Sequence, residues 1–511
     1  MKEPFFVGSP LWTFIKKYAI IYGCQLSWQR VDSCCSFTMI ISNSVINWTS
    51  VHHQRAFKPK EFIMVVKKTS PIRIDMFPTH HLLHWDEIVA WWLWNNFAHP
   101  DFKVKSGAPI TFHNASRTTL DGGRATIEWI RKHKQMPIGI WGSPLDEHRR
   151  PEESDEEYEA RLAKQECASS LSAKMLEVDQ KEELQSILRF SRRVDNTATA
   201  DPRDVSTLIK RLHDNRETRR GLVKKWVRDP AKFARIMKLL DRQLTLGEMI
   251  LWVEDAIWAK CCEVPQTDDF TIDKIHELIR TQTPEQTTDN SYEADQWFQI
   301  GSEALELDQL LFESVTAEEY KNYKTVVPYR GKSRGGKVID LKLVVVSSDD
   351  SRIGRYARSS MGDQAAVIVQ RRVDGSYIIQ SNRYHGIRMH DASRALKTEE
   401  ALLRDLPLPR WDELRRELTH NVWHYFARGE ALFNGAKTSP DIEPTKIGLP
   451  RIVELVKMAL SVESFERTRS ETCAQDICTS TLKNPCPWYK YGLGRCQTIR
   501  WETRRSAAVG K

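Results

Sequence analysis

Two short polar segments contain the residue types best suited to chemistry. The first reads THHLLHWDE at residues 79–87, and the second reads LDEH at residues 145–148. Imidazole and carboxylate groups together form the ligand sets that hold divalent metals in hydrolytic sites. The two segments therefore predict a metal-dependent hydrolase.

The first segment spaces its candidate ligands as His80-x-x-x-His84-x-Asp86. On a loop that leaves a strand, these three side chains could converge on one point. Two nitrogens and one oxygen do not complete the shell of an ion, and two ions would need further carboxylates. The full set of expected ligands is His80, His84, Asp86, Asp146, His148 and Asp195. We expect Glu87 and Glu147 to support or cap rather than bind.

Strands and helices alternate around these segments. Strands are predicted at 72–76, 108–112 and 137–141, and helices at 86–97 and 124–134. This alternation favours an α/β fold with a mainly parallel sheet. Sites in such sheets form at the carboxyl ends of strands, which is where both polar segments fall.

The remaining sequence suggests a helical region followed by a second domain. Residues 151–330 have helical periodicity, and the basic, glycine-rich stretch 330–337 marks a boundary. Buried-strand patterns and a hairpin at Asp374-Gly375 then predict a smaller α/β or α+β domain. The expected layout is an unassigned extension or strand-rich appendage at 1–68, a metal-binding domain with the helical region at 69–330, a substrate-binding domain at 338–462, and a four-cysteine tail at 465–511.

Composition is that of a globular protein. The chain has 511 residues, of which 41% are hydrophobic and 28% charged, and its net charge is +8. Such a charge permits a polyanionic partner without requiring one. No apolar run reaches the roughly 18 residues of a membrane helix. We expect a cytoplasmic protein with reduced thiols and no membrane partner, and a homodimer remains one option for its assembly.

These residues resemble the motifs of the DHH phosphoesterases. Thr79-His80 and His84-Trp85-Asp86-Glu87 are similar to the first motif in the branch that includes the melanocyte-proliferating-gene protein, and Asp146-Glu147-His148 resembles the Asp-His-His motif. Asp195 is similar to the fourth-motif aspartate. The chain departs from the family at Gly139, near the place of the second-motif aspartate, although Asp121 could be a displaced version.

The resemblance implies hydrolysis of a phosphodiester in a nucleotide or a short single-stranded nucleic acid, in an exonuclease-like reaction. One or two Mn²⁺ or Mg²⁺ ions would activate a water molecule. Asp86 and Asp146 would be catalytic through the metal, and His148 would be either a ligand or a general acid.

Two later segments are candidates for binding substrate phosphate. Arg352 and Arg355 open a helix after a Ser/Asp-rich stretch, where phosphate binds well, although ordinary capping explains the same pattern. Residues 433–438 resemble the family's substrate loop and supply Asn434, Gly435, Lys437 and Thr438. The basic segment 203–242 could follow a phosphate backbone or form a solvated helix.

The tail holds Cys473, Cys478, Cys486 and Cys496. Four thiolates could hold a structural Zn²⁺ and fold a segment too small for a core. Because paired Cys-x-x-Cys spacing is absent, free cysteines or an iron–sulfur ligand set stay open.

Two rival functions also stay open. A degenerate hydrolase fold could act as a nucleic-acid-binding or regulatory protein, as Gly139 would suggest. Imidazole–carboxylate sites also serve hydrolysis of bonds other than phosphodiesters.

Overall fold

The computed structural model describes residues 25–31, 34–41, 44–51, 66–68, 70–113, 120, 124–146, 160, 163–197, 201–282, 290–332, 336–406, 422–426, 429–435, 442–461, 491, 493 and 496. Several residues singled out in the sequence lie outside these ranges: Asp121, Glu147, His148, Lys437, Thr438, Cys473, Cys478 and Cys486. The chain divides into one unit made of residues 1–75 and 98–106, and another made of residues 76–97 and 107–511.

The first unit is built from strands. β1 (Gln25–Val31), β2 (Cys34–Ile41), β3 (Ser44–Val51) and β4 (Val66–Lys68) form an antiparallel sheet in chain order. β5 (Ile72–Ile74) pairs in parallel with β7 (Phe102–Val104). The described residues between Gln25 and Lys68 therefore all lie in strands.

The second unit begins with a short parallel arrangement around β6 (Phe77–His80). On one side β6 pairs with β8 (Ile110–His113) in parallel. On the other side, the amide of Ile138 donates to the carbonyl of Pro78 at 2.8 Å. All four residues of β6 are buried, as expected for a strand covered on both faces. His80 is its last residue, so the strand delivers an imidazole to its carboxyl end.

The predicted strands in this region are shorter than expected. The segment predicted as 72–76 stops at Ile74, and β6 begins after Asp75 and Met76. The segment predicted as 137–141 contributes an isolated bridge at Ile138. Gly139 follows with a φ of +61°, which is outside the extended region and ends the pairing.

Helix α2 (Trp85–Asn96) follows the first polar segment, and α3 (Ile127–His133) follows β8. The indoles of Trp85, Trp92 and Trp94 are almost completely buried. Trp85 donates through Nε1 to Ser191 Oγ at 2.9 Å, and Trp94 donates to Ser172 Oγ at 3.2 Å. These contacts fix α2 against the helices that follow.

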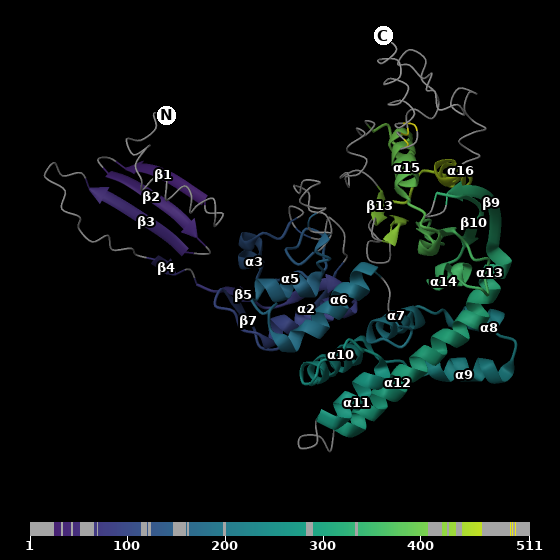
Figure 1. The fold of residues 1–511 in the computed structure, drawn as a ribbon, viewed down its shortest axis with the longest axis horizontal. Helices are drawn as coiled ribbons and strands as arrows, with labels where there is room; N and C mark the ends of the chain where they lie inside the picture. Colours follow the sequence, from purple (N-terminus) through teal and green to yellow (C-terminus); the bar gives the residue numbers. More distant parts are fainter. Residues whose placement is uncertain are drawn as a thin grey trace, which may run out of the picture. The chain divides into compact units, whose positions relative to one another are not determined.

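The predicted helical region is confirmed over most of its described length. It comprises α5 (Ala168–Met175), η2 (Glu182–Leu184), α6 (Gln185–Thr197), α7 (Val205–Arg216), α8 (Arg220–Trp226), α9 (Pro230–Asp241), α10 (Leu246–Cys261), α11 (Ile272–Gln282), α12 (Asn290–Leu311), the π-helix η3 (Phe312–Thr316) and α13 (Ala317–Tyr323). The long helix α12 runs beside α9 and α11 (Figure 1).

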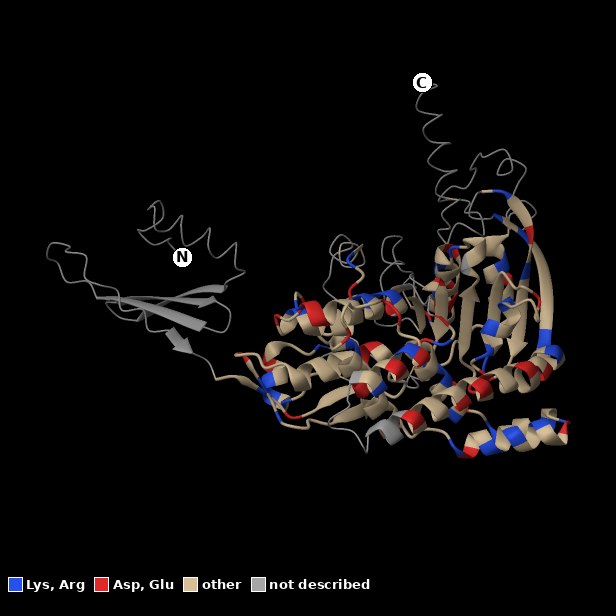
Figure 2. Ribbon diagram, turned by 60° about the horizontal axis from the view of Figure 1, so that its bottom comes forward, with Lys and Arg blue, Asp and Glu red and all other residues tan. Residues whose placement is uncertain are grey.

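Many basic residues of segment 203–242 pair with acidic ones. The pairs include Arg203–Asp273, Arg211–Asp308, Arg219–Asp349, Arg220–Asp241, Arg235–Glu306 and Arg242–Glu303. Figure 2 shows Lys and Arg interspersed with Asp and Glu along the helices. This pairing favours the solvated-helix interpretation of the segment over a track for a phosphate backbone.

The C-terminal region contains a mixed six-stranded sheet. Its order is β13 (Trp423–Phe426), β14 (Ala431–Asn434), β12 (Tyr377–Ser381), β11 (Val367–Arg371), β10 (Val338–Ser347) and β9 (Lys324–Lys332). β10 and β11 are parallel and are joined through α14 (Ile353–Arg358), while the other neighbours are antiparallel. The hairpin predicted at Asp374-Gly375 joins β11 to β12, and Gly375 has a φ of +85°.

Alternation along β10 places a core on each face of this sheet. Leu343 and Val345 face one core, which includes residues of α15 (His390–Leu403) and α16 (Leu449–Leu460). Val344 and Val346 face a second core, which includes residues of η3, α13 and α14. The expected mixture of helices and strands is confirmed. The expected mainly parallel N-terminal sheet is not: among the described strands, parallel pairing there is limited to the two-stranded sheets β5–β7 and β6–β8. None of the described helices is long and apolar enough to cross a membrane.

One buried acid beside this sheet should make stability depend on pH. Burial, with help from Asp350 and Asp349, raises the pKa of Glu319 to about 6. The folded state therefore keeps its proton more tightly than the unfolded state, and ionisation costs stability as the pH rises past the unfolded pKa. A shift of this size corresponds to about 2 kcal/mol.

We expect Glu319→Gln to leave the unfolding free energy unchanged below pH 4.5 and to raise it by about 2 kcal/mol above pH 7. The Ser348 hydroxyl, which lies 3.2 Å from Glu319 Oε2, can donate to the amide oxygen as well. Denaturant unfolding of both proteins across this pH range measures the difference. A difference that stayed constant with pH would contradict the expectation.

Candidate metal centre

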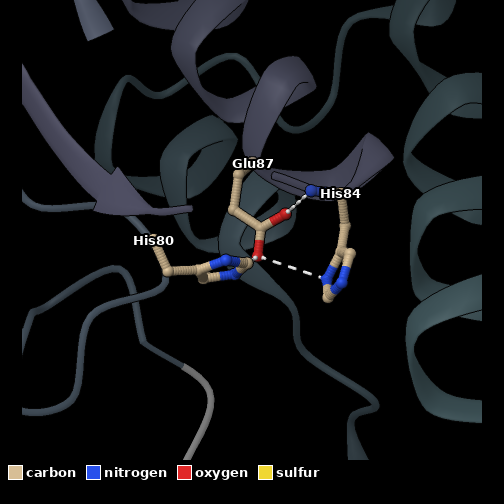
Figure 3. A group of neighbouring side chains, drawn as sticks. All are labelled: His80, His84 and Glu87. Atoms are coloured by element: carbon tan, nitrogen blue, oxygen red, sulfur yellow. Dashed lines mark hydrogen bonds and ion pairs between the residues drawn. The ribbon is translucent and has the colours of Figure 1, made fainter. Parts of the chain in front are cut away.

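Three side chains from β6 and the start of α2 point toward one another (Figure 3). They are His80, at the end of the strand; His84, at the N-cap of the helix; and Glu87, in its first turn. Each offers a ligand atom, and these atoms all lie within 4.8 Å of one another. Among the described residues this is the group suited to holding a metal ion.

Glu87 joins the two imidazoles. Its Oε1 lies 3.0 Å from Nε2 of His80 and 3.7 Å from Nδ1 of His84. Its Oε2 accepts a hydrogen bond of 2.8 Å from the backbone amide of His84. The last contact belongs to a capping box, in which a glutamate three residues into a helix satisfies the amide of the cap residue. The local helix-start signal therefore fixes the direction of the Glu87 side chain.

Gly139 provides the space for this carboxylate. A Cβ at position 139 would lie 3.0 Å from Oε1 and 3.1 Å from Cγ of Glu87. Gly139 thus lies directly against the imidazole–carboxylate group. In this chain the Glu87 carboxylate occupies the space that a side chain at position 139 would need.

Gly139→Ala should disturb both the fold and the group. The left-handed backbone costs alanine about 1–2 kcal/mol of stability, and the new methyl group would press on the Glu87 carboxylate. We expect the unfolding free energy to fall by about 1–3 kcal/mol. If the group holds a divalent ion, the affinity for that ion should fall as well. Chemical denaturation and metal titration measure the two effects.

Gly107→Ala is the matched control. Its φ is +64°, but a Cβ there would meet no atom within 4 Å. It should lose stability through backbone strain alone and keep its metal affinity. Equal metal affinity in both variants would show that position 139 does not act through Glu87.

Burial and charge set the protonation of the group. Burial alone would raise the pKa of Glu87, but the imidazoles of His84 and His80 outweigh it, so the pKa lies below its usual value. Desolvation of the covered part of the ring lowers the pKa of His84, by less than full burial would, because the side chain is 47% exposed; the charges of His80, Lys210 and His213 add to this shift, and Glu87 opposes it. Metal ligation requires an anionic carboxylate, and the lowered pKa of Glu87 keeps that carboxylate ionised.

The donor set fits a divalent ion. Ligand bonds of about 2.0–2.2 Å place two ligands of one ion at most about 4.4 Å apart, so small side-chain rotations would gather this group. Nδ1 of His80 is buried and has no hydrogen-bond partner among the described residues. The His84 side chain is 47% exposed, so an incoming ion or substrate can reach that ring.

Asp86 does not join this group in the structure. Its buried carboxylate accepts hydrogen bonds from the backbone amides of Ala168 and Ser169, at 2.7 and 3.0 Å, and from the Ser169 hydroxyl. It therefore caps the N-terminus of α5, where a negative charge is favourable. Burial and the neighbouring Glu87 raise the pKa of Asp86. Asp86 was predicted to be a ligand and Glu87 to support the site, whereas the structure places the Glu87 carboxylate beside the imidazoles.

Asp146 and Asp195 lie on other elements. Asp146 is buried, and its Oδ2 accepts from the Gly142 amide at 3.2 Å. Asp195 lies on α6. Burial and the charge of Arg211 lower the pKa of Lys210, and the charge of Asp195 opposes part of that shift. Among the described residues, neither belongs to the group whose ligand atoms lie within 4.8 Å. Their roles as ligands stay predictions, as does that of His148, which lies outside the described residues.

The arginines predicted to bind substrate make contacts within the chain. Arg352 is 4% exposed and donates to Asp308, Asp350, Asn215 and Thr218. Arg355 donates to Asp308 at 2.7 Å. These contacts join α12 and α7 to the start of α14. A structural role accounts for both arginines without a ligand.

The described part of the predicted substrate loop is also engaged. Asn434 is fully buried, donates to the carbonyl of Val422 and accepts from the amide of Thr445. Gly435 follows with a φ of +70°. Of the tail cysteines, Cys496 packs against the core on the α15 side of the sheet.

Two residues of α7 near the centre were missed in the sequence. His213 and Lys210 lie close enough to His84 for their charges to lower its pKa. They stand three positions apart and so share one helical face. In the sequence, the one indication of this role was a histidine next to the apolar Leu212. It lies within the basic segment 203–242 and was not recognised as a site residue.

Comparison with known proteins identifies no family for this chain. No family model matches it, and no curated protein matches it. Among solved structures, an uncharacterized protein from Helicobacter pylori G27 is similar at 9% identity, with 75% of this chain and 98% of that chain covered and a TM-score of 0.18. A similarity this low carries no argument about fold or function.

Proposed function

We propose that the chain is a metal-dependent phosphoesterase resembling the DHH enzymes, with its metal centre at His80, His84 and Glu87. It would hydrolyse a phosphodiester of a nucleotide or short single-stranded nucleic acid. One observation carries the proposal: two imidazoles and a carboxylate converge at the end of a parallel strand, with ligand atoms within 4.8 Å. Such strand ends are where open α/β sheets form their sites.

Each side chain has a separate part in this proposal. A bound Mn²⁺ or Mg²⁺ would supply positive charge to the phosphoryl oxygens and lower the pKa of a water molecule. Glu87 provides the anionic ligand and is held through its other oxygen by the His84 amide. His80 is buried and fixes the inner side of the centre, while the half-exposed His84 leaves the outer side open to substrate.

The centre would differ from the DHH pattern at one carboxylate. Glu87 would replace the second-motif aspartate, whose place in this chain is taken by Gly139, because the Glu87 carboxylate lies against Gly139. Asp86 would support the centre by capping α5 instead of binding the ion. Asp146, His148 and Asp195 remain candidates for completing the shell or holding a second ion.

The domain layout is part of the same proposal. Residues 69–330 would carry the metal centre with its helical region, and residues 338–462 would contact the substrate. The cysteines of the tail would hold a structural Zn²⁺. Since Arg352, Arg355 and Asn434 make structural contacts, substrate contacts in the second domain would come from other residues, with Lys437 and Thr438 still candidates.

A second function is favoured by those same contacts. If the substrate-binding residues of the family are used here for structure, and the second-motif aspartate is replaced by Gly139, the fold could bind nucleic acid or regulate without cleaving. Metal binding without cleavage would support this alternative.

The test is manganese-dependent cleavage of a labelled single-stranded oligonucleotide, measured together with metal content. The proposal expects mononucleotide release that needs Mn²⁺ and disappears in Glu87→Gln. Glu128→Gln is the control, because Glu128 is an exposed acid in the first turn of α3. A wild-type protein that bound no divalent metal would overturn the proposal.

A further inference from the structure

Helix α7 contacts the loop that carries the metal ligand His84. Nε2 of His213 lies 2.8 Å from the carbonyl oxygen of Leu83. A carbonyl can only accept, so Nε2 carries the proton and donates it. His213 is 8% exposed and Leu83 is fully buried, so this hydrogen bond is shielded from water.

The bonded carbonyl belongs to the peptide group that leads into His84. The carbonyl of Leu83 and the amide of His84 are the two polar ends of one planar unit. His213 donates to the first end, and Glu87 accepts from the second at 2.8 Å. This peptide plane is therefore held from both sides, once from α7 and once from α2.

The side chains of the loop are anchored by the burial of Leu83 and by the ring contacts His81–Phe112 and His84–His80. Residues 81–84 connect β6 to α2 without regular secondary structure. In such a segment, rotation of a peptide plane changes where the next side chain points. Fixing the Leu83–His84 plane consequently fixes the direction in which the His84 imidazole leaves the backbone.

We propose that His213 is a positioning residue of the metal centre, which presets His84 by holding the Leu83–His84 peptide. The inference rests on the proposed function. Contacts that orient metal ligands from outside the coordination shell typically contribute about 10-fold to 100-fold in metal affinity. His213 is distant in sequence from both polar segments and was not among the expected site residues.

Metal titration calorimetry with Mn²⁺ on the full chain tests this role. We expect His213→Ala to raise the dissociation constant for Mn²⁺ by about 10-fold to 100-fold. His213→Gln should restore most of the affinity, since its side-chain amide places an N–H donor near the position of Nε2. Thermal unfolding without metal shows whether each variant is folded at the titration temperature.

Arg216→Ala is the matched control. Arg216 lies on the same helix and donates to the carbonyl of Leu244 at 2.7 and 3.1 Å. The Arg216→Ala variant loses a similar hydrogen bond from a side chain to a backbone carbonyl. That carbonyl, however, is not in the loop that carries His84. We expect its metal affinity to equal that of the wild type, whatever its stability.

The outcomes separate this inference from the proposed function. If the wild type binds Mn²⁺ and Glu87→Gln does not, the centre stands, and unchanged affinity in His213→Ala would overturn the positioning role alone. Failure of a folded His213→Gln to recover affinity would overturn it as well, because the ring rather than its donor would then matter. A wild type that binds no metal overturns the proposed function first.

Discussion

Glu87→Gln should abolish divalent-metal binding, with a loss of affinity of more than about 100-fold, greater than that for contacts outside the coordination shell. The substitution keeps the shape of the side chain and its capacity to accept from the His84 amide, but it removes the charge. An amide oxygen is a weaker ligand for Mn²⁺ than a carboxylate, and the amide group would face the His80 ring at about the present 3.0 Å. Calorimetric titration with Mn²⁺ and Zn²⁺ measures the change.

Asp86→Asn provides the sharpest contrast to Glu87→Gln. The two acids are adjacent, yet the Asp86 carboxylate accepts from the amides of Ala168 and Ser169 at the N-terminus of α5. Asparagine keeps one acceptor and loses the charge, so stability should fall by about 1–2 kcal/mol while metal affinity stays near that of the wild type. Loss of metal in Asp86→Asn with full retention in Glu87→Gln would reverse the assignment.

Arg352→Ala should cause the largest loss of stability, about 3–5 kcal/mol of unfolding free energy. The guanidinium is 4% exposed, donates to Asp308 and Asp350 at 2.9 Å each, and contacts Asn215 at 2.8 Å. Removing it would break the ion pair with Asp350 and one of the ion pairs of Asp308, which also contacts Arg355 and Arg211. Arg352→Lys should recover only part of the loss, because an ammonium cannot match the fork of the guanidinium.

Arg189→Ala is the control for this measurement. Arg189 pairs with Asp268 at 3.0 Å, but the two side chains are 53% and 56% exposed. Such a surface pair contributes about 0–1 kcal/mol. Denaturant unfolding of the three variants distinguishes a structural from a substrate-binding Arg352: a folded, fully stable Arg352→Ala with weakened oligonucleotide binding would restore the substrate role.

Local patterns predicted those parts of the fold that local interactions determine. The helix at 86–97 and the hairpin at Asp374-Gly375 were recognisable because first-turn acids and a turn dipeptide act over a few residues. The strands predicted at 72–76 and 137–141 came out shorter, since register and backbone bends such as that at Gly139 depend on distant partners.

In the candidate site, too, local features could be predicted from the sequence, whereas long-range contacts could not. His80 and His84 converge as their spacing predicted. The sequence could not show whether Asp86 or Glu87 faces the imidazoles. Successive helical residues point about 100° apart. In addition, the amides that donate to Asp86 lie more than eighty positions away in the sequence. The partners of Arg352 on α12 and α7 could not be predicted either, because they are also distant in the sequence.

The close approach of Gly139 to Glu87 has a consequence for sequence divergence. An acid on the strand side and an acid on the helix side cannot both occupy this space. Positions 87 and 139 should therefore change together among homologous chains, with a side chain at one matched by a smaller or redirected residue at the other. During evolution, the carboxylate could then shift from position 87 to position 139, or the reverse, in only two ways. Both positions would change together, or an intermediate sequence would lack the carboxylate.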